Sequence, residues 1–132
     1  MKVVADTNIL LAVALGEPER EGLIRAVVGH ELIAPEVLPF EIGNAFTAMV
    51  RKRTLRPEDV VATWEIISAI PIELQRVDMR AALALAVEHG IYAYDAYYLE
   101  CAVKRGSPLL TLDKGMQRIA QNLGIKVLEL PT

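Results

Sequence analysis

Short apolar runs alternate along this chain with longer segments in which apolar residues recur every three or four positions. The runs have strand length, and the segments have the period of an amphipathic helix. Strand-like runs lie at residues 3–5, 31–34, 72–74, 109–112 and 125–130, and helical segments lie at 9–15, 18–28, 38–53, 60–70, 79–89, 94–105 and 114–123. Apolar strands separated by helices predict a mainly parallel sheet that is covered on both faces. We therefore predict an α/β fold, a three-layer α/β/α sandwich.

The length and composition of the chain fit one folded domain. It has 132 residues, of which 53% are hydrophobic and 23% charged, a balance that allows one hydrophobic core. We predict a single domain over residues 1–132. The formal net charge of -3 argues against a protein that coats nucleic acid by neutralising phosphates. Cys101 is the only cysteine, which excludes an internal disulfide and a thiolate zinc site.

The apolar runs are far shorter than the roughly 20 residues that a membrane-spanning helix needs. Met1 and Lys2 lead directly into the first strand-like run, without the three regions of a secretory signal peptide. We expect a protein with no membrane segment that acts in the cytoplasm.

Four acidic residues follow strands or begin helices. Asp6 closes the first strand-like run, and Asp113 follows the run at 109–112. Glu41 and Asp95 lie in the first turns of two predicted helices. The carboxyl ends of parallel strands meet at one edge of a sheet, and ligands collect there. We therefore expect the four carboxylates to converge at that edge.

Each acid alone has an ordinary structural explanation, because carboxylates cap helices and complement the helix dipole. As a set they repel one another and raise one another's pKa unless a cation neutralises them. A ligand set made only of oxygen suits Mg²⁺ or Mn²⁺. Such ions promote hydrolysis of a phosphodiester bond. Asp6, Glu41, Asp95 and Asp113 are therefore the predicted metal ligands and catalytic residues.

Three further polar residues stand next to these acids. Thr7, Asn8 and Thr111 could orient the carboxylates or metal-bound waters through hydrogen bonds. Capping and turn formation explain the same residue types equally well. We predict them as supporting residues of the site.

Four short motifs together resemble those of a known family. Asp6-Thr7-Asn8, residues 39–45, residues 94–99 and residues 110–113 are similar, in order and approximate spacing, to the motifs of PIN domains. The resemblance spans nearly the whole chain, and it is strongest to VapC-type toxins of toxin-antitoxin pairs. The acidic quartet of that family falls on the four acids named above, and its hydroxyl positions fall on Thr7 and Thr111.

The resemblance implies more than the residues alone do. It implies a parallel sheet of about five strands, Mg²⁺ or Mn²⁺ bound at the acidic quartet, and endoribonuclease activity on an RNA substrate. It also implies a homodimer and a cognate antitoxin protein as partner.

Surrounding residues suggest how RNA could be held. Arg51, Lys52, Arg53 and Arg56 form the densest basic patch, which could position phosphates or could be a solvated helix end. Four tyrosines surround Asp95 and could stack on unpaired bases or pack in the core, namely Tyr92, Tyr94, Tyr97 and Tyr98. The apolar faces of the helices that begin near Leu38 and Pro57 could bind a second copy or an antitoxin helix.

Two alternatives remain open from the sequence. A different metal-dependent phosphoryl-transfer hydrolase, such as a haloacid-dehalogenase-like phosphatase, needs a second aspartate two residues after the first, whereas Asn8 stands there. A non-catalytic binding module that keeps the PIN fold could use the acidic cleft only for a partner or a structural ion.

Overall fold

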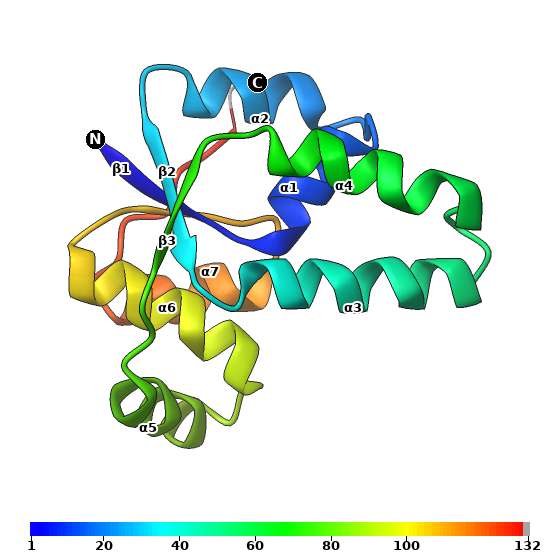
Figure 1. Cartoon of the computed structure of the whole chain (residues 1–132). Helices are drawn as coiled ribbons and strands as arrows, with labels where there is room; N and C mark the ends of the chain where they lie inside the picture. Colours follow the sequence, from blue (N-terminus) through cyan, green and yellow to red (C-terminus); the bar gives the residue numbers. More distant parts are fainter. Residues whose placement is uncertain (131–132) are drawn as a thin grey trace.

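The computed structural model describes residues 1–130 and shows helices alternating with short strands (Figure 1). The elements, in chain order, are β1 (Lys2–Ala5), α1 (Thr7–Ala14), α2 (Arg20–Val27), β2 (Glu31–Pro35), α3 (Leu38–Arg51), the 3-10 helix η1 (Pro57–Asp59), α4 (Val60–Ser68), β3 (Ile72–Gln75), α5 (Met79–His89), α6 (Ala93–Arg105), β4 (Leu109–Leu110) and α7 (Lys114–Asn122).

Within residues 1–130 the strands form one four-stranded sheet in the order β3-β2-β1-β4. Every pair in it is parallel: Val3 of β1 lies opposite Leu32, and Val4 lies opposite Leu109. Parallel neighbours require a crossover between strands, and the helices provide these crossovers. The predicted α/β fold with a parallel sheet is confirmed.

Successive side chains of the strands point to opposite faces of the sheet, and they are buried on both faces. Val3, Ala5 and Leu110 pack in one apolar cluster with residues of α1 and α2. Val4 and Leu109 belong to the cluster on the other face, with residues of α3, α6 and α7. These helices lie on opposite sides of the strands in Figure 1. The period of two along a strand therefore produces the predicted three layers.

The prediction of a fifth strand at residues 125–130 is wrong. This segment makes one isolated parallel bridge, between Leu109 and Val127. The Leu109 amide donates to the Lys126 carbonyl at 2.9 Å, and the Leu128 amide donates to the Leu109 carbonyl at 2.9 Å. Among the described residues its only strand partner is β4, which is two residues long. The segment therefore cannot extend this pairing into a strand.

The strand predicted at residues 109–112 also ends early, at Leu110. The Thr111 carbonyl accepts a hydrogen bond from Gln117 Nε2 at 2.7 Å. The Thr111 hydroxyl accepts one from the Asp113 amide at 3.1 Å. These local bonds turn the backbone away from the sheet and direct it toward Asp113.

Helix boundaries differ from the predicted ones by up to two residues. For example, α1 begins at Thr7 rather than Ile9, because the Asp6 side chain accepts from the Ile9 amide and caps the helix. In the described part of the chain, every helix is too short or too polar to cross a membrane.

Candidate active site

Two of the predicted acids cap helices at the carboxyl-end edge of the sheet. Asp6 follows β1, and its Oδ1 accepts from the Ile9 amide at 3.1 Å. Asp113 follows β4 and accepts from the Met116 amide at 3.1 Å. Since β1 and β4 are parallel neighbours, their carboxyl ends lie together and so do the two caps.

The other two acids lie in the first turns of helices that begin at the same edge. Glu41 belongs to α3 and Asp95 to α6. All four carboxylates line one cavity of about 140 Å³. Its other lining residues are Thr7, Asn8, Tyr98 and Met116. The structure thus brings together the acids that stand far apart in the sequence.

A hydroxyl bridges the two helix caps. The Thr111 hydroxyl donates to Asp6 Oδ2 and accepts from the Asp113 amide. Asp6 and Thr111 are both buried, with 5% and 2% of their surface exposed. This bond fixes the orientation of the Asp6 carboxylate, which is the role considered for Thr111. Asn8 lines the cavity but is exposed, and its side chain makes no hydrogen bond within residues 1–130.

Glu41 is held by two hydroxyls. Thr7 donates to Glu41 Oε1, and the Tyr98 hydroxyl donates to the same oxygen at 2.8 Å. From the sequence, Tyr98 is predicted only to stack on bases or to pack in the core, and not to hold an acid of the site. Its spacing from Asp95 could have indicated the role, because residues i and i+3 share one face of a helix.

Burial and mutual repulsion disfavour charge on the acids of the cavity. Burial raises the pKa of Asp6 to about 6, and the carboxylates of Glu41 and Asp113 add to this effect. Burial also raises the pKa of Asp95, with further contributions from Asp113 and Glu41. No lysine or arginine lines the cavity. The described residues leave these negative charges without a counter-ion.

The donors of the cavity fit a hard divalent cation. They are carboxylate and hydroxyl oxygens, which Mg²⁺ and Mn²⁺ prefer. Among the described residues, no three acidic, histidine or cysteine side chains converge into a ready-made cage. Mg²⁺ commonly retains several waters and binds one or two carboxylates directly, so an open cavity with carboxylates on several sides suits it.

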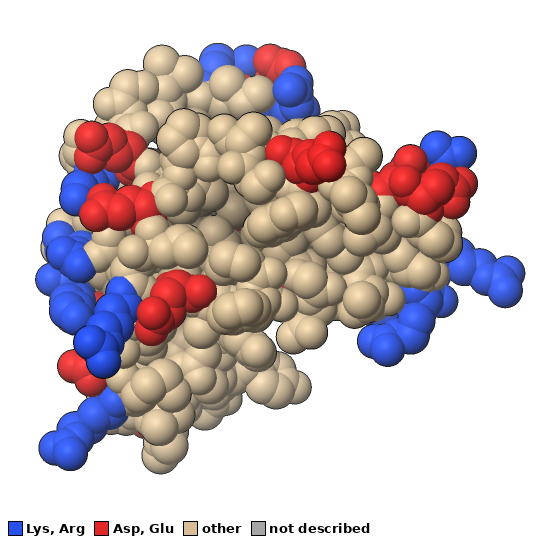
Figure 2. All heavy atoms as spheres, viewed as in Figure 1, with Lys and Arg blue, Asp and Glu red and all other residues tan. Residues whose placement is uncertain are grey.

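The predicted basic patch lies away from the cavity. Arg51 ends α3, ten residues after Glu41, and a helix rises about 1.5 Å per residue, so the two are about 15 Å apart along it. Arg56 Nε pairs with Asp59 at 2.8 Å and lies 3.8 Å from Glu58. Figure 2 shows basic and acidic side chains side by side where α3 ends and α4 begins.

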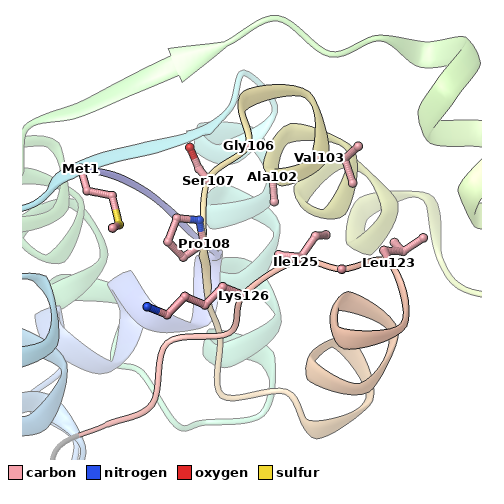
Figure 3. A pocket seen from close by; sticks show the side chains of 10 residues that line it. Met1, Ala102, Val103, Gly106, Ser107, Pro108, Leu123, Ile125 and Lys126 are labelled. Carbon is pink, nitrogen blue, oxygen red and sulfur yellow. The ribbon is translucent and has the colours of Figure 1, made fainter.

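A second cavity lies at the opposite edge of the sheet (Figure 3). It has a volume of about 370 Å³, and its lining includes Met1, which precedes β1, and Pro108, which precedes β4. Its lining contains one charged side chain, that of Lys126, and no carboxylate side chain. This cavity therefore offers no carboxylate ligand for a cation, in contrast to the cavity at the carboxyl-end edge.

Solved structures of similar fold include toxins. VapC20 of Mycobacterium tuberculosis, described as a sarcin-ricin loop cleaving toxin, matches with a TM-score of 0.64 and 14% identity over 89% of this chain and 94% of that one. A toxin-antitoxin complex from Klebsiella pneumoniae matches with a TM-score of 0.54 and 17% identity over 84% and 86%. At these identities the likeness concerns the fold.

Sequence comparison identifies the family. Ribonuclease VapC3 of Pyrobaculum aerophilum is 32% identical over 119 residues, which cover 86% of this chain and 91% of that protein. The model of the PIN domain matches residues 3–122, a span that contains all four acids. The chain therefore belongs to the PIN domain family, within which it is similar to VapC-type toxins.

Proposed function

We propose that this protein is a metal-dependent endoribonuclease, the toxin of a VapBC-type toxin-antitoxin pair that acts in the cytoplasm. The observation that carries the proposal is the single cavity lined by Asp6, Glu41, Asp95 and Asp113 without a lysine or arginine. Similarity to a ribonuclease over most of both chains supports RNA as the substrate.

The residues of the cavity have two roles: the acids bind the ion, and the hydroxyl residues orient the acids. Asp6, Glu41, Asp95 and Asp113 would hold one or more Mg²⁺ or Mn²⁺ ions. A bound ion of this kind supplies a Lewis acid that stabilises charge on phosphodiester oxygens and lowers the pKa of water.

The hydroxyl residues orient the carboxylates before the ion arrives. Thr111 holds Asp6, and Thr7 holds Glu41. Carboxylates fixed in this way need little rearrangement when charge develops, which is the main benefit of a preorganised site.

The acids also explain why the proposed substrate must arrive together with a cation. Phosphate is negatively charged, and four carboxylates repel it at close range. A divalent ion held by these acids would neutralise their charge and let the same cavity accept a phosphate. This requirement distinguishes the proposed enzyme from a protein that binds RNA through basic residues alone.

Two protein partners belong to the proposal, a cognate antitoxin and a second copy of the chain. Similarity of fold to a toxin-antitoxin complex supports the antitoxin. Apolar side chains are exposed on α4, where Val61, Trp64 and Ile66 have exposed fractions of 66%, 37% and 51%. Exposed apolar surface of this kind is typical of a face that binds another protein.

The test is cleavage of a panel of transfer, ribosomal and synthetic RNAs with Mg²⁺ or Mn²⁺, with chelator, and with an Asp6→Asn/Asp95→Asn double variant. We expect metal-dependent cutting by the wild type and none by the folded variant. Asparagine preserves the size of each side chain and caps helices as well as aspartate does.

A non-catalytic PIN-fold module would bind metal or a partner without cutting any RNA in the panel. A different phosphoryl-transfer hydrolase would leave RNA intact and release phosphate from small phosphate esters. Either result, obtained with folded wild-type protein at millimolar metal, contradicts the proposed ribonuclease.

A further inference from the structure

Tyr98 carries a buried hydroxyl group at the edge of the acidic cavity. The side chain has 2% of its surface exposed and packs in the core cluster that includes Leu99 and Met116. Phenylalanine would fill the same apolar space. The hydroxyl therefore needs an explanation other than packing, and its contacts provide one.

The hydroxyls of Tyr98 and Thr7 and the carboxylate of Glu41 form a triangle of oxygens. The Tyr98 hydroxyl lies 2.8 Å from Glu41 Oε1 and 2.9 Å from Thr7 Oγ1, and Thr7 closes the third side by donating to Glu41. A carboxylate oxygen accepts hydrogen bonds, so the hydroxyls of Thr7 and Tyr98 are the donors in their bonds to Glu41. When both donate to the carboxylate, each bond is charge-assisted.

Both donors meet the same carboxylate oxygen, and this leaves the other oxygen available. Within residues 1–130 all hydrogen bonds accepted by the Glu41 side chain fall on Oε1. A glutamate side chain has several rotatable bonds, and fixing it costs conformational entropy. Two donors on one side hold the carboxylate plane, so that Oε2 keeps one orientation in a cavity that Glu41 shares with three other acids.

We propose that Tyr98 is a positioning residue that, together with Thr7, holds Glu41 in the orientation that binds the divalent ion. This inference rests on the proposed function, because it assigns a role toward the same metal site. Tyr98 acts through Glu41 and does not itself bind the ion.

The neighbouring tyrosines offer a matched control. Tyr97 lies on the same helix, and its ring packs edge-on against Tyr94 with centroids 5.7 Å apart. Its hydroxyl makes no hydrogen bond to an acid among the described residues, and Tyr97 does not line the acidic cavity. A tyrosine-to-phenylalanine change there removes the same atom without touching Glu41.

The experiment is calorimetric titration of the full chain with Mn²⁺ alone, for wild type, Tyr98→Phe and Tyr97→Phe. Loss of an orienting group next to a metal ligand typically weakens metal binding about 10- to 100-fold. We expect a change of that size for Tyr98→Phe and no change for Tyr97→Phe. RNA cleavage by Tyr98→Phe should fall at limiting Mn²⁺ and recover when Mn²⁺ is raised, since the defect lies in binding the ion.

Variants of Thr7 keep the inference testable if Tyr98→Phe fails to fold, which thermal unfolding in chelator will show. Thr7→Val removes the other donor and should weaken Mn²⁺ binding, whereas Thr7→Ser keeps the hydroxyl and should restore it. Folded Tyr98→Phe protein with wild-type Mn²⁺ affinity would overturn the role of Tyr98. Wild-type protein that neither binds Mn²⁺ nor cuts RNA would instead contradict the proposed function itself.

Discussion

The two edges of the sheet differ in chemistry although the same strands form both. At the carboxyl-end edge, four carboxylates line a cavity of about 140 Å³. At the amino-end edge, the cavity of about 370 Å³ beside β1 and β4 has Lys126 as its one charged side chain and no carboxylate. Strand direction decides this difference, because helices that begin at the carboxyl ends bring capping acids and free amide groups to that edge.

The largest contrast between the edges should appear in catalysis. We expect Asp113→Asn to lower the rate of RNA cleavage by about 10²- to 10³-fold, the size of effect seen when one electrostatic contact to a transition state is lost. Lys126→Gln, at the other edge, should leave the rate within about twofold, since that cavity holds no group of the proposed chemistry. The measurement is the rate of RNA cleavage by each variant and by the wild type at saturating metal and RNA.

Equal losses in the two variants would show that cleavage depends on something both edges share, such as overall stability. Circular dichroism of both proteins distinguishes that case.

The second contrast concerns stability and pH in metal-free protein. The pKa of Asp6 is raised from 3.8 to about 6, which corresponds to about 3 kcal/mol at 1.36 kcal/mol per pH unit. Folding favours the protonated acid, so this burial destabilises the protein as pH rises from about 4 to about 6, and the loss persists above that range. Asp6→Asn, which carries no charge, should therefore be more stable than wild type at pH 8, by up to about 3 kcal/mol.

The extra stability of Asp6→Asn should vanish below pH 4, where Asp6 of the wild type is protonated in the folded and the unfolded chain. Chemical denaturation of both proteins in chelator at pH 4 and pH 8 measures this difference. A stability difference that is the same at both pH values would contradict the assigned cause.

The third contrast comes from adding metal. An ion that binds only the folded protein stabilises it by about 2.7 kcal/mol at one hundred times its dissociation constant. We expect Mn²⁺ to raise the melting temperature of the wild type and to have much less effect on Asp6→Asn. Lys126→Gln should respond like the wild type. A response of equal size in all three proteins would place the ion outside the acidic cavity.

The smallest expected effect concerns the basic patch at the end of α3. If Arg51 and Lys52 contact RNA phosphates, each change to glutamine should reduce the salt dependence of RNA binding. The slope of log affinity against log salt concentration should become shallower by about one for each change. The cutting rate at saturating RNA should stay the same, because the patch lies about 15 Å from Glu41. Binding measured across a range of salt concentrations tests this, and an unchanged slope assigns the patch to a solvated helix end.

Much of the fold could be predicted because the signals are local. The apolar runs that became β1, β2 and β3 are short and bounded by turn residues. Strand direction then predicts that Asp6 after β1 and Asp113 after β4 lie at the same edge of the sheet. The strand predicted at residues 125–130 failed for a tertiary reason. Its pairing depended on the length of β4, which Thr111 and Gln117 end through side-chain bonds that no periodicity reveals.

The geometry around Glu41 was equally hidden. Helical spacing places Tyr98 on the same face of α6 as Asp95, but it does not show that α3 brings Glu41 within 2.8 Å of the Tyr98 hydroxyl. That contact joins residues 57 positions apart. Sequence patterns identify acids by residue type, whereas the side chains that hold them depend on packing between helices.

The most direct test of the acidic edge as a cation site is anomalous X-ray scattering from crystals grown with millimolar Mn²⁺. We predict a manganese peak in the cavity lined by Asp6, Glu41, Asp95 and Asp113, and its loss in crystals of Asp6→Asn. A well-diffracting wild-type crystal with manganese only elsewhere, or with none, would contradict the central claim that these carboxylates are gathered to hold a divalent ion.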